Sequence, residues 1–250
     1  MLFSSITKPK RIFPLILLLL CGCGEVRDGN VSETVQNISE ITQNISEQAQ
    51  ETESAETAEI SAVRNDGVLM FGFTADEFVN SFNAVYSDEY GEDYLTPVSQ
   101  WNCYEACSPL VDNDGMAYCF TEDREILSMP NITLFTDDNG SVYEIMATFD
   151  DHGYQDWLNK KFGIISMNMI ETVLPDMADT EAFYRELYAL AGTNFYGDDY
   201  KFPPSDFYRS GDVGLYSYYG GGTINICAVP ADDELENELS RADCVIHGIE

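Results

Sequence analysis

The segment ITLFTDDNGSVYEIM, residues 132–146, decides the fold class of this chain. Its two flanks, 132–135 and 142–146, alternate apolar and polar residues as half-buried β-strands do. Between them lie Asp137, Asp138, Asn139 and Gly140, residue types that favour a tight turn. The segment therefore predicts an antiparallel β-hairpin.

Further strands are expected on both sides of this hairpin. A second turn signal, from Asp112 to Gly115, interrupts another run rich in β-forming residues. We expect strands near 98–106, 116–121, 131–136 and 141–149, forming an antiparallel meander. Two more strands, near 212–219 and 223–229, flank the glycines 220–222, which we interpret as a hairpin turn.

Helical patterns alternate with the strands. Thr74 and Glu77 form a capping box, and apolar residues follow at the spacing of one helix face. The same spacing returns over 157–173, before Pro175, and again from Asp179 or Thr180 to Gly192. The sequence therefore predicts an α+β fold, an antiparallel sheet with helices packed on one face, and short hairpins argue against a parallel Rossmann-type sheet. This succession resembles nuclear-transport-factor-like and β-lactamase-inhibitor-like domains at fold level only, which implies no function.

The chain is strongly acidic, with 44 Asp and Glu against 12 Lys and Arg. Residues 67–250 form one domain of ordinary size and hold 34 of the acidic and seven of the basic residues, a formal charge of −27. Such a field repels phosphate backbones, so nucleic-acid binding is excluded. It favours cationic partners or metal ions.

Five cysteines fall in this domain, so at least one is unpaired or bonded to another chain. Cys107 and Cys119 lie at nearly symmetric distances from the Asp112–Gly115 signal, and we expect a disulfide between them. A second bridge, Cys227 to Cys244, would join the acidic C-terminal tail to the last strand. A zinc site at Cys103 and Cys107 lacks a second matched pair of ligands.

The N-terminal residues have the zones of an export signal. Lys8, Lys10 and Arg11 precede an apolar run, 12–20, that is too short to span a membrane. The run ends in Leu-Cys-Gly-Cys, residues 20–23, which resembles the lipobox of bacterial lipoproteins. That resemblance implies that residues 1–22 are a signal peptide and that Cys23 carries the lipid, palmitate included. The protein would then be anchored at the extracytoplasmic face of the cell membrane. The alternative is an ordinary secretory signal without lipid.

Residues 23–66 follow the signal as a segment rich in Ser, Thr, Glu and Gln. Val31, Ile38 and Ile45 recur at one heptad position, which raises a coiled-coil alternative. The second apolar position of the heptad holds Thr34, Ile41 and Gln48, so little surface can be buried. We expect a flexible linker that holds the domain away from the bilayer.

No motif in the domain indicates catalysis. The sequence lacks a Gly-x-Ser-x-Gly elbow and a His-Glu-x-x-His helix, and neither acidic turn fits a calcium-binding EF-hand. Carboxylates beside His152 could orient its imidazole, but a strand-to-helix loop is equally natural there. We assign no catalytic residue, no metal ligand and no cofactor.

Aromatic residues crowd the C-terminal third, and Tyr216, Tyr218 and Tyr219 form the candidate binding surface. The structural alternative is that strands favour tyrosine and use it in cross-strand pairs. The expected function is a lipid-anchored, non-catalytic domain that binds a protein or carbohydrate ligand. The alternative function is a cell-wall-directed carbohydrate hydrolase, which needs two carboxyl groups roughly 5–10 Å apart in a cleft.

Overall fold

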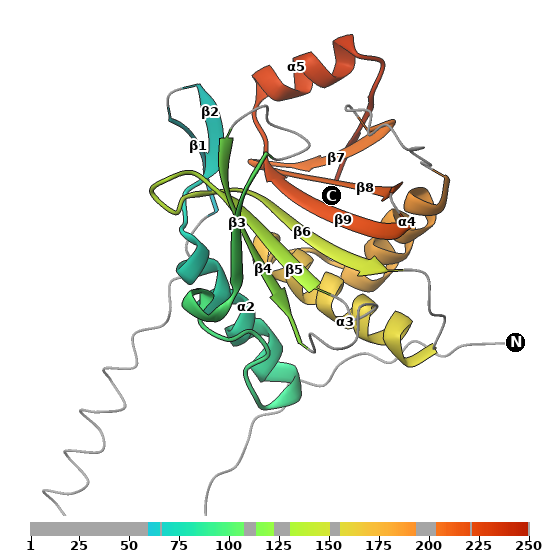
Figure 1. Ribbon diagram of the computed structural model, residues 1–250. Helices are drawn as coiled ribbons and strands as arrows, with labels where there is room; N and C mark the ends of the chain where they lie inside the picture. Colours follow the sequence, from blue (N-terminus) through green and yellow to red (C-terminus); the bar gives the residue numbers. More distant parts are fainter. Residues whose placement is uncertain are drawn as a thin grey trace, which may run out of the picture. The chain divides into compact units, whose positions relative to one another are not determined.

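The computed structural model describes residues 60–65, 67–107, 114–122, 131–150, 156–193, 204–220 and 222–249. The chain divides into two units, Met1–Thr57 and Ala58–Glu250, and every described residue belongs to the second. The described residues form an eight-stranded sheet in the order β10-β7-β8-β9-β6-β5-β4-β3, together with a two-stranded hairpin and several helices (Figure 1).

Four consecutive strands form one side of the sheet. They are β3 (Asn102–Cys107), β4 (Asp114–Thr121), β5 (Asn131–Thr136) and β6 (Val142–Asp150), and each pairs antiparallel with the next. The turn between β5 and β6 is the predicted one. The Asp137 carboxylate accepts hydrogen bonds from the backbone N–H groups of Asn139 (2.9 Å) and Ser141 (2.8 Å). Gly140 closes the turn at φ 82°, a left-handed conformation that glycine adopts without strain.

The turn predicted at Asp112 to Gly115 is misplaced, because β4 already begins at Asp114. Gly115 is a strand residue opposite Ala106 on β3. A Cβ atom added there would lie 2.4 Å from the backbone oxygen of Thr136 and 2.7 Å from the hydroxyl of Tyr143. Close packing between strands, and not a turn, therefore requires glycine at this position.

The other side of the sheet is built from late segments of the chain. β7 (Asp206–Ser210), β8 (Val213–Gly220) and β9 (Thr223–Pro230) pair antiparallel in sequence order. β9 then pairs with β6, which joins the two halves of the sheet. The last strand, β10 (Val245–Gly248), adds parallel to β7 and forms the far edge.

Three helices cover one face of the sheet: α2 (Ala75–Tyr90), α3 (Asp156–Val173) and α4 (Thr180–Thr193), with the short helix η1 (Val98–Gln100) after α2 (Figure 1). The predicted capping box starts α2: the Thr74 hydroxyl accepts from the backbone N–H of Glu77, whose carboxylate accepts from that of Thr74. The main core lies between these helices and the sheet, and its fully buried members include Phe82, Phe162, Ile165, Leu187, Ile132, Ile145 and Ile226.

The opposite face is partly covered as well. Helix α5 (Asp233–Arg241) lies on that side in Figure 1, and Leu239 packs there with Phe207 and Tyr216. The hairpin of β1 (Ala62–Asn65) and β2 (Val68–Phe71) places Met70 against Ala117, Phe135 and Tyr143. The α+β class with a mostly antiparallel sheet is therefore confirmed. The expectation that the helices pack on one face is wrong for α5, which lies on the second face, and strands β8 and β9 are buried on both faces.

β1 lies within the range expected to be linker, residues 23–66, so the folded part of the chain starts before Gly67. Arg64 on β1 binds the Asp232 carboxylate at 2.7 Å, across more than 160 residues of sequence. The rest of the predicted linker, up to residue 59, lies outside the described residues.

Candidate functional site

Strand β3 forms one exposed edge of the eight-stranded sheet. β3 pairs on one side with β4, from Asn102 opposite Cys119 to Cys107 opposite Asp114, and no described strand pairs with its other side. Its first four residues, 102–105, are all exposed, and Tyr104 keeps 50% of its surface accessible. Within the described part of the chain, the backbone donors and acceptors on this edge have no strand partner.

The stretch of sequence that contains this edge carries only negative charge. The stretch from Asn65 to Asp123 contains no Lys, Arg or His. We call its described part, residues 67–107 and 114–122, the acidic sector. Its exposed carboxylates are Asp76, Glu77, Asp88, Glu89, Glu92, Asp93, Glu105 and Glu122. None of these carboxylates has a basic residue within the sector itself.

A stack of aromatic rings joins α2 to the strands of the acidic sector. Tyr94 lies 5.1 Å from Tyr86 of α2 and 5.4 Å from Phe120 of β4, measured between ring centroids. The Tyr94 hydroxyl donates to Glu122 at 3.3 Å, and burial together with that carboxylate raises the pKa of Tyr94. Lys161 of α3 forms an ion pair with the same Glu122 and lies over the Tyr94 ring. One carboxylate of the sector is therefore neutralised from outside, and the stack fixes α2 beneath β4.

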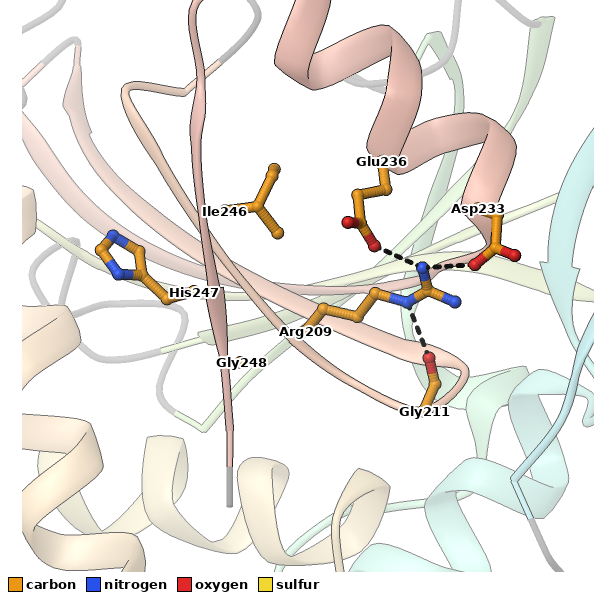
Figure 2. A pocket seen from close by; sticks show the side chains of 7 residues that line it. All are labelled: Arg209, Gly211, Asp233, Glu236, Ile246, His247 and Gly248. Atoms are coloured by element: carbon orange, nitrogen blue, oxygen red, sulfur yellow. Dashed lines mark hydrogen bonds and ion pairs between the residues drawn. The ribbon is translucent and has the colours of Figure 1, made fainter.

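The opposite edge, at β10, carries a cavity of about 400 Å³ that is open to solvent. Figure 2 shows the Arg209 guanidinium directed at two carboxylates of α5. It donates to Asp233 at 2.9 Å, to Glu236 at 2.5 Å and to the backbone oxygen of Gly211 at 2.9 Å. Because one cation already holds both carboxylates, this cavity offers neither a free anion site nor a free acid–base pair.

His247 lies on the other side of β10, away from Arg209 (Figure 2). Its ring stacks on Tyr208 at 4.6 Å between centroids, and its Nε2 is 2.9 Å from the Asp206 carboxylate. Burial works against the charged form of Asp206, but hydrogen bonds from His247 and Ser205 outweigh it and lower the pKa of this carboxyl group. The Ser205 hydroxyl donates to Asp206 rather than to the imidazole, so the three do not form a nucleophile–base pair.

The predicted tyrosine surface is wrong for Tyr216 and Tyr218. These side chains keep only 1% and 7% of their surface exposed, in the core beneath α5. Tyr219 points to the other face, as the strand period predicts, and packs against the core under the helices. The sequence showed that two faces exist, but α5 covers the face that was expected to be open.

Tyr216 belongs to a buried polar cluster that the sequence did not indicate. Its hydroxyl donates to Oε1 of Glu144 at 2.8 Å, and both side chains are almost completely buried. Cys227 lies beside them on β9, and burial, then the Glu144 charge, raise the pKa of its thiol. Because Cys227 and Glu144 are both completely buried, the cluster indicates a structural role.

The predicted disulfides do not form, since Cys119, Cys227 and Cys244 are free thiols. The β3–β4 register places Cys107 opposite Asp114, five residues before Cys119. That offset is about 17 Å, whereas a disulfide needs Cα atoms within about 7 Å. The other proposed pair is separated by β7 and β8, which puts β9 and β10 about 14 Å apart. The hairpin is shifted relative to the turn signal, so sequence symmetry was misleading.

Three expectations fall on residues that the structure does not describe: lipidation of Cys23, the role of His152 and the nature of most of the linker. Among the described residues, no three metal-binding side chains lie close enough together to hold an ion. No helix in the described ranges has the length and apolar character needed to cross a membrane.

Comparison of the chain with protein-family models, with curated proteins and with solved structures finds no match. The acidic sector is the candidate functional site, because it combines backbone groups that no described strand pairs with, an exposed aromatic ring and charge of one sign.

Proposed function

We propose that this protein is a lipid-anchored, extracytoplasmic binding protein whose domain takes a cationic polypeptide partner without catalysis. The lipobox-like exit at residues 20–23 supports the anchor, with Cys23 as the acylated residue. The export signal supports a location outside the cytoplasm. The formal charge of −27 on residues 67–250 supports a partner of opposite sign.

One observation carries the binding part of this proposal. The acidic sector presents eight exposed carboxylates, on α2, on β3 and in the segments that follow α2 and β4, and the stretch that contains it has no basic residue of its own. Clustered charges of one sign raise the association rate of an oppositely charged protein and exclude partners of the same sign. Screening acts over about 8 Å at physiological salt, so neighbouring carboxylates reinforce one another at a docked partner.

The alternative of a carbohydrate hydrolase has weaker support. The best-placed carboxylates in a described cavity, Asp233 and Glu236, are held by Arg209. The other enclosed carboxylate, Glu144, lies in the core with Tyr216. A glycosidase needs two carboxyl groups facing a substrate cleft.

The anchor is tested by labelling cells with a fatty-acid probe. The wild-type protein should incorporate the label and sediment with membranes, and Cys23→Ala should lose both properties. Cys103→Ala is the matched control and should keep them, because Cys103 lies on the β3 edge. Label that persists in Cys23→Ala contradicts the assignment.

The binding function is tested by a photo-crosslinking residue placed at Glu92, an exposed acid of the acidic sector. Crosslinks formed in cells should join this site to a polypeptide with a basic contact segment, identified by mass spectrometry. The same crosslinker at Asp176, an exposed acid outside the sector, is the control. Equal yields at both positions, or a partner segment without basic residues, would refute the proposal.

A further inference from the structure

Apart from the charged side chain of Glu105, the β3 edge lacks the features that normally prevent strand addition. Its six residues, Asn102–Cys107, include no lysine and no proline. Its register with β4 runs one-to-one over the whole strand, without a bulge that would twist the edge away. Proteins usually combine several of these devices at an edge, so a six-residue edge that carries a single charged side chain can still pair with another strand.

The two faces of β3 offer different side-chain environments to an added strand. Tyr104 stands opposite Ala117, on the face away from helices α2–α4, and supplies an exposed ring. Cys103 and Glu105 alternate with it and point to the helix face. Tyr118 stands opposite Cys103 and packs against the helix-side core. Burial is the largest cause that raises the pKa of Tyr118, followed by Cys103 and then by the negative charge of Asp76 on α2. The helix side of the edge is therefore the acidic side.

The negative charge of the domain favours a basic polypeptide over the other segments that could pair with this edge. A second copy of the domain brings another −27, and the chain's own segment 25–66 holds ten acidic residues and only two arginines. Both would place like charges beside the exposed carboxylates of α2. A basic segment gains from the same field.

We infer that the β3 edge binds an extended, basic segment of a partner polypeptide by strand addition. The inference rests on the proposed function and specifies its geometry. Basic side chains at alternate positions face Glu105 and the carboxylates of α2, and the intervening apolar side chains lie beside Tyr104. Backbone hydrogen bonds to β3 supply the register.

The test uses the chain after its signal, with Cys23→Ser to prevent acylation, under reducing conditions. The probes are an alternating Lys–Val octapeptide, a Glu–Val octapeptide and a Lys–Val octapeptide whose alternate backbone nitrogens are methylated. Binding is measured by fluorescence anisotropy, and protection of the β3 amides by hydrogen exchange. The Lys–Val peptide should bind and protect β3, and the other two should bind at least about tenfold more weakly.

A charge reversal on the edge sharpens the test. Glu105→Lys should weaken binding of the Lys–Val peptide by about tenfold, because it also protects the edge with a lysine. Asp176→Lys, a charge reversal outside the acidic sector, should change it by less than about twofold. Circular dichroism checks that both variants are folded.

The outcomes separate this inference from the proposed function. If the methylated peptide binds as tightly as its parent and β3 remains unprotected, strand addition is wrong while cationic binding stands. If no Lys–Val peptide binds at low salt, both fail. If β3 is instead protected by self-association, seen as a dimer in sedimentation, the occupant is a second copy and the inference is overturned.

Discussion

Arg209 on β7 and Arg64 on the β1–β2 hairpin hold the acidic start of helix α5, whereas the chain segment that contains the β3 edge carries exposed carboxylates and no basic residue of its own. Arg209 holds Asp233 and Glu236, and Arg64 holds Asp232 and Glu234. The stretch from Asn65 to Asp123 has no basic residue to do the same. In a chain with so few cations, their positions show which acidic segments close onto the fold and which remain available to a partner.

The largest expected difference is in the stability lost when an aromatic side chain is truncated beneath α5 or on the β3 edge. Phe207 is fully buried beneath α5, so Phe207→Ala should lower the free energy of unfolding by about 3–5 kcal/mol. Tyr104→Ala at the open edge should cost less than about 1 kcal/mol, because half of that side chain is already in water. Urea unfolding measures both. Similar losses for the two variants would show that the β3 edge is packed and not open.

The buried polar cluster gives the next largest effect. Tyr216→Phe removes the hydrogen bond to Glu144 inside the core and should cost about 2 kcal/mol. Tyr208→Phe removes a bond of similar length to Glu186, which is exposed and can bind water instead. That control should lose no more than about 1 kcal/mol in the same urea unfolding measurement. A larger loss for Tyr208→Phe than for Tyr216→Phe would show that the bond to Glu186, and not the buried bond to Glu144, contributes more to stability.

Removing the charge of Arg209 tests how much its ion pairs with Asp233 and Glu236 stabilise the domain. Arg209→Gln should destabilise the domain by about 1 kcal/mol, since the ion pairs are partly exposed. The difference from wild type should shrink in 1 M salt, where the screening length is about 3 Å. Arg185→Gln, at a far more exposed pair within α4, is the control and should have less effect. A salt-independent loss would mean that Arg209 acts through packing of its aliphatic stem.

The smallest expected effect is on the pH dependence of the ion pair between Arg64 and Asp232. A hydrogen bond from Arg64 lowers the pKa of Asp232, so this carboxylate contributes stability above its unfolded pKa of about 3.9 and loses it as pH falls through the lower folded value. Arg64→Gln should raise the pKa of Asp232 and reduce the part of the acid destabilisation that comes from this group. A carboxyl NMR titration measures the shift. Arg241→Gln is the control and should leave the pKa of Asp232 unchanged.

The local elements were predictable because their signals are short-range. The capping box at Thr74, the turn from Asp137 to Gly140 and the apolar spacing of 157–173 each lie within a few residues of the structure they specify. α5 could have been found the same way. Asp232 precedes Leu235 and Leu239 at N-cap and i, i+4 spacing, but the density of acids made the segment resemble a solvated tail.

The candidate site was harder to predict because it is defined partly by what lies beside it: no basic residue in its stretch and no described strand on the outer side of β3. The lack of basic residues between Asn65 and Asp123 is visible in the sequence. That β3 is an edge is not visible, since any of the predicted strands could have occupied that position. The tyrosines were misplaced for the related reason that a strand's period gives two faces without saying what covers each.

The sequence by itself determined the α+β class, most helix and strand positions and the strong negative charge, because propensity, capping and composition act locally. Only the tertiary structure decided that β9 pairs with β6, that β10 adds parallel to β7, and that α5 buries Tyr216 on the second face. Those contacts join residues far apart in the chain, and each strand can pair with several others. The choice depends on the summed packing of the whole sheet, which no single segment specifies.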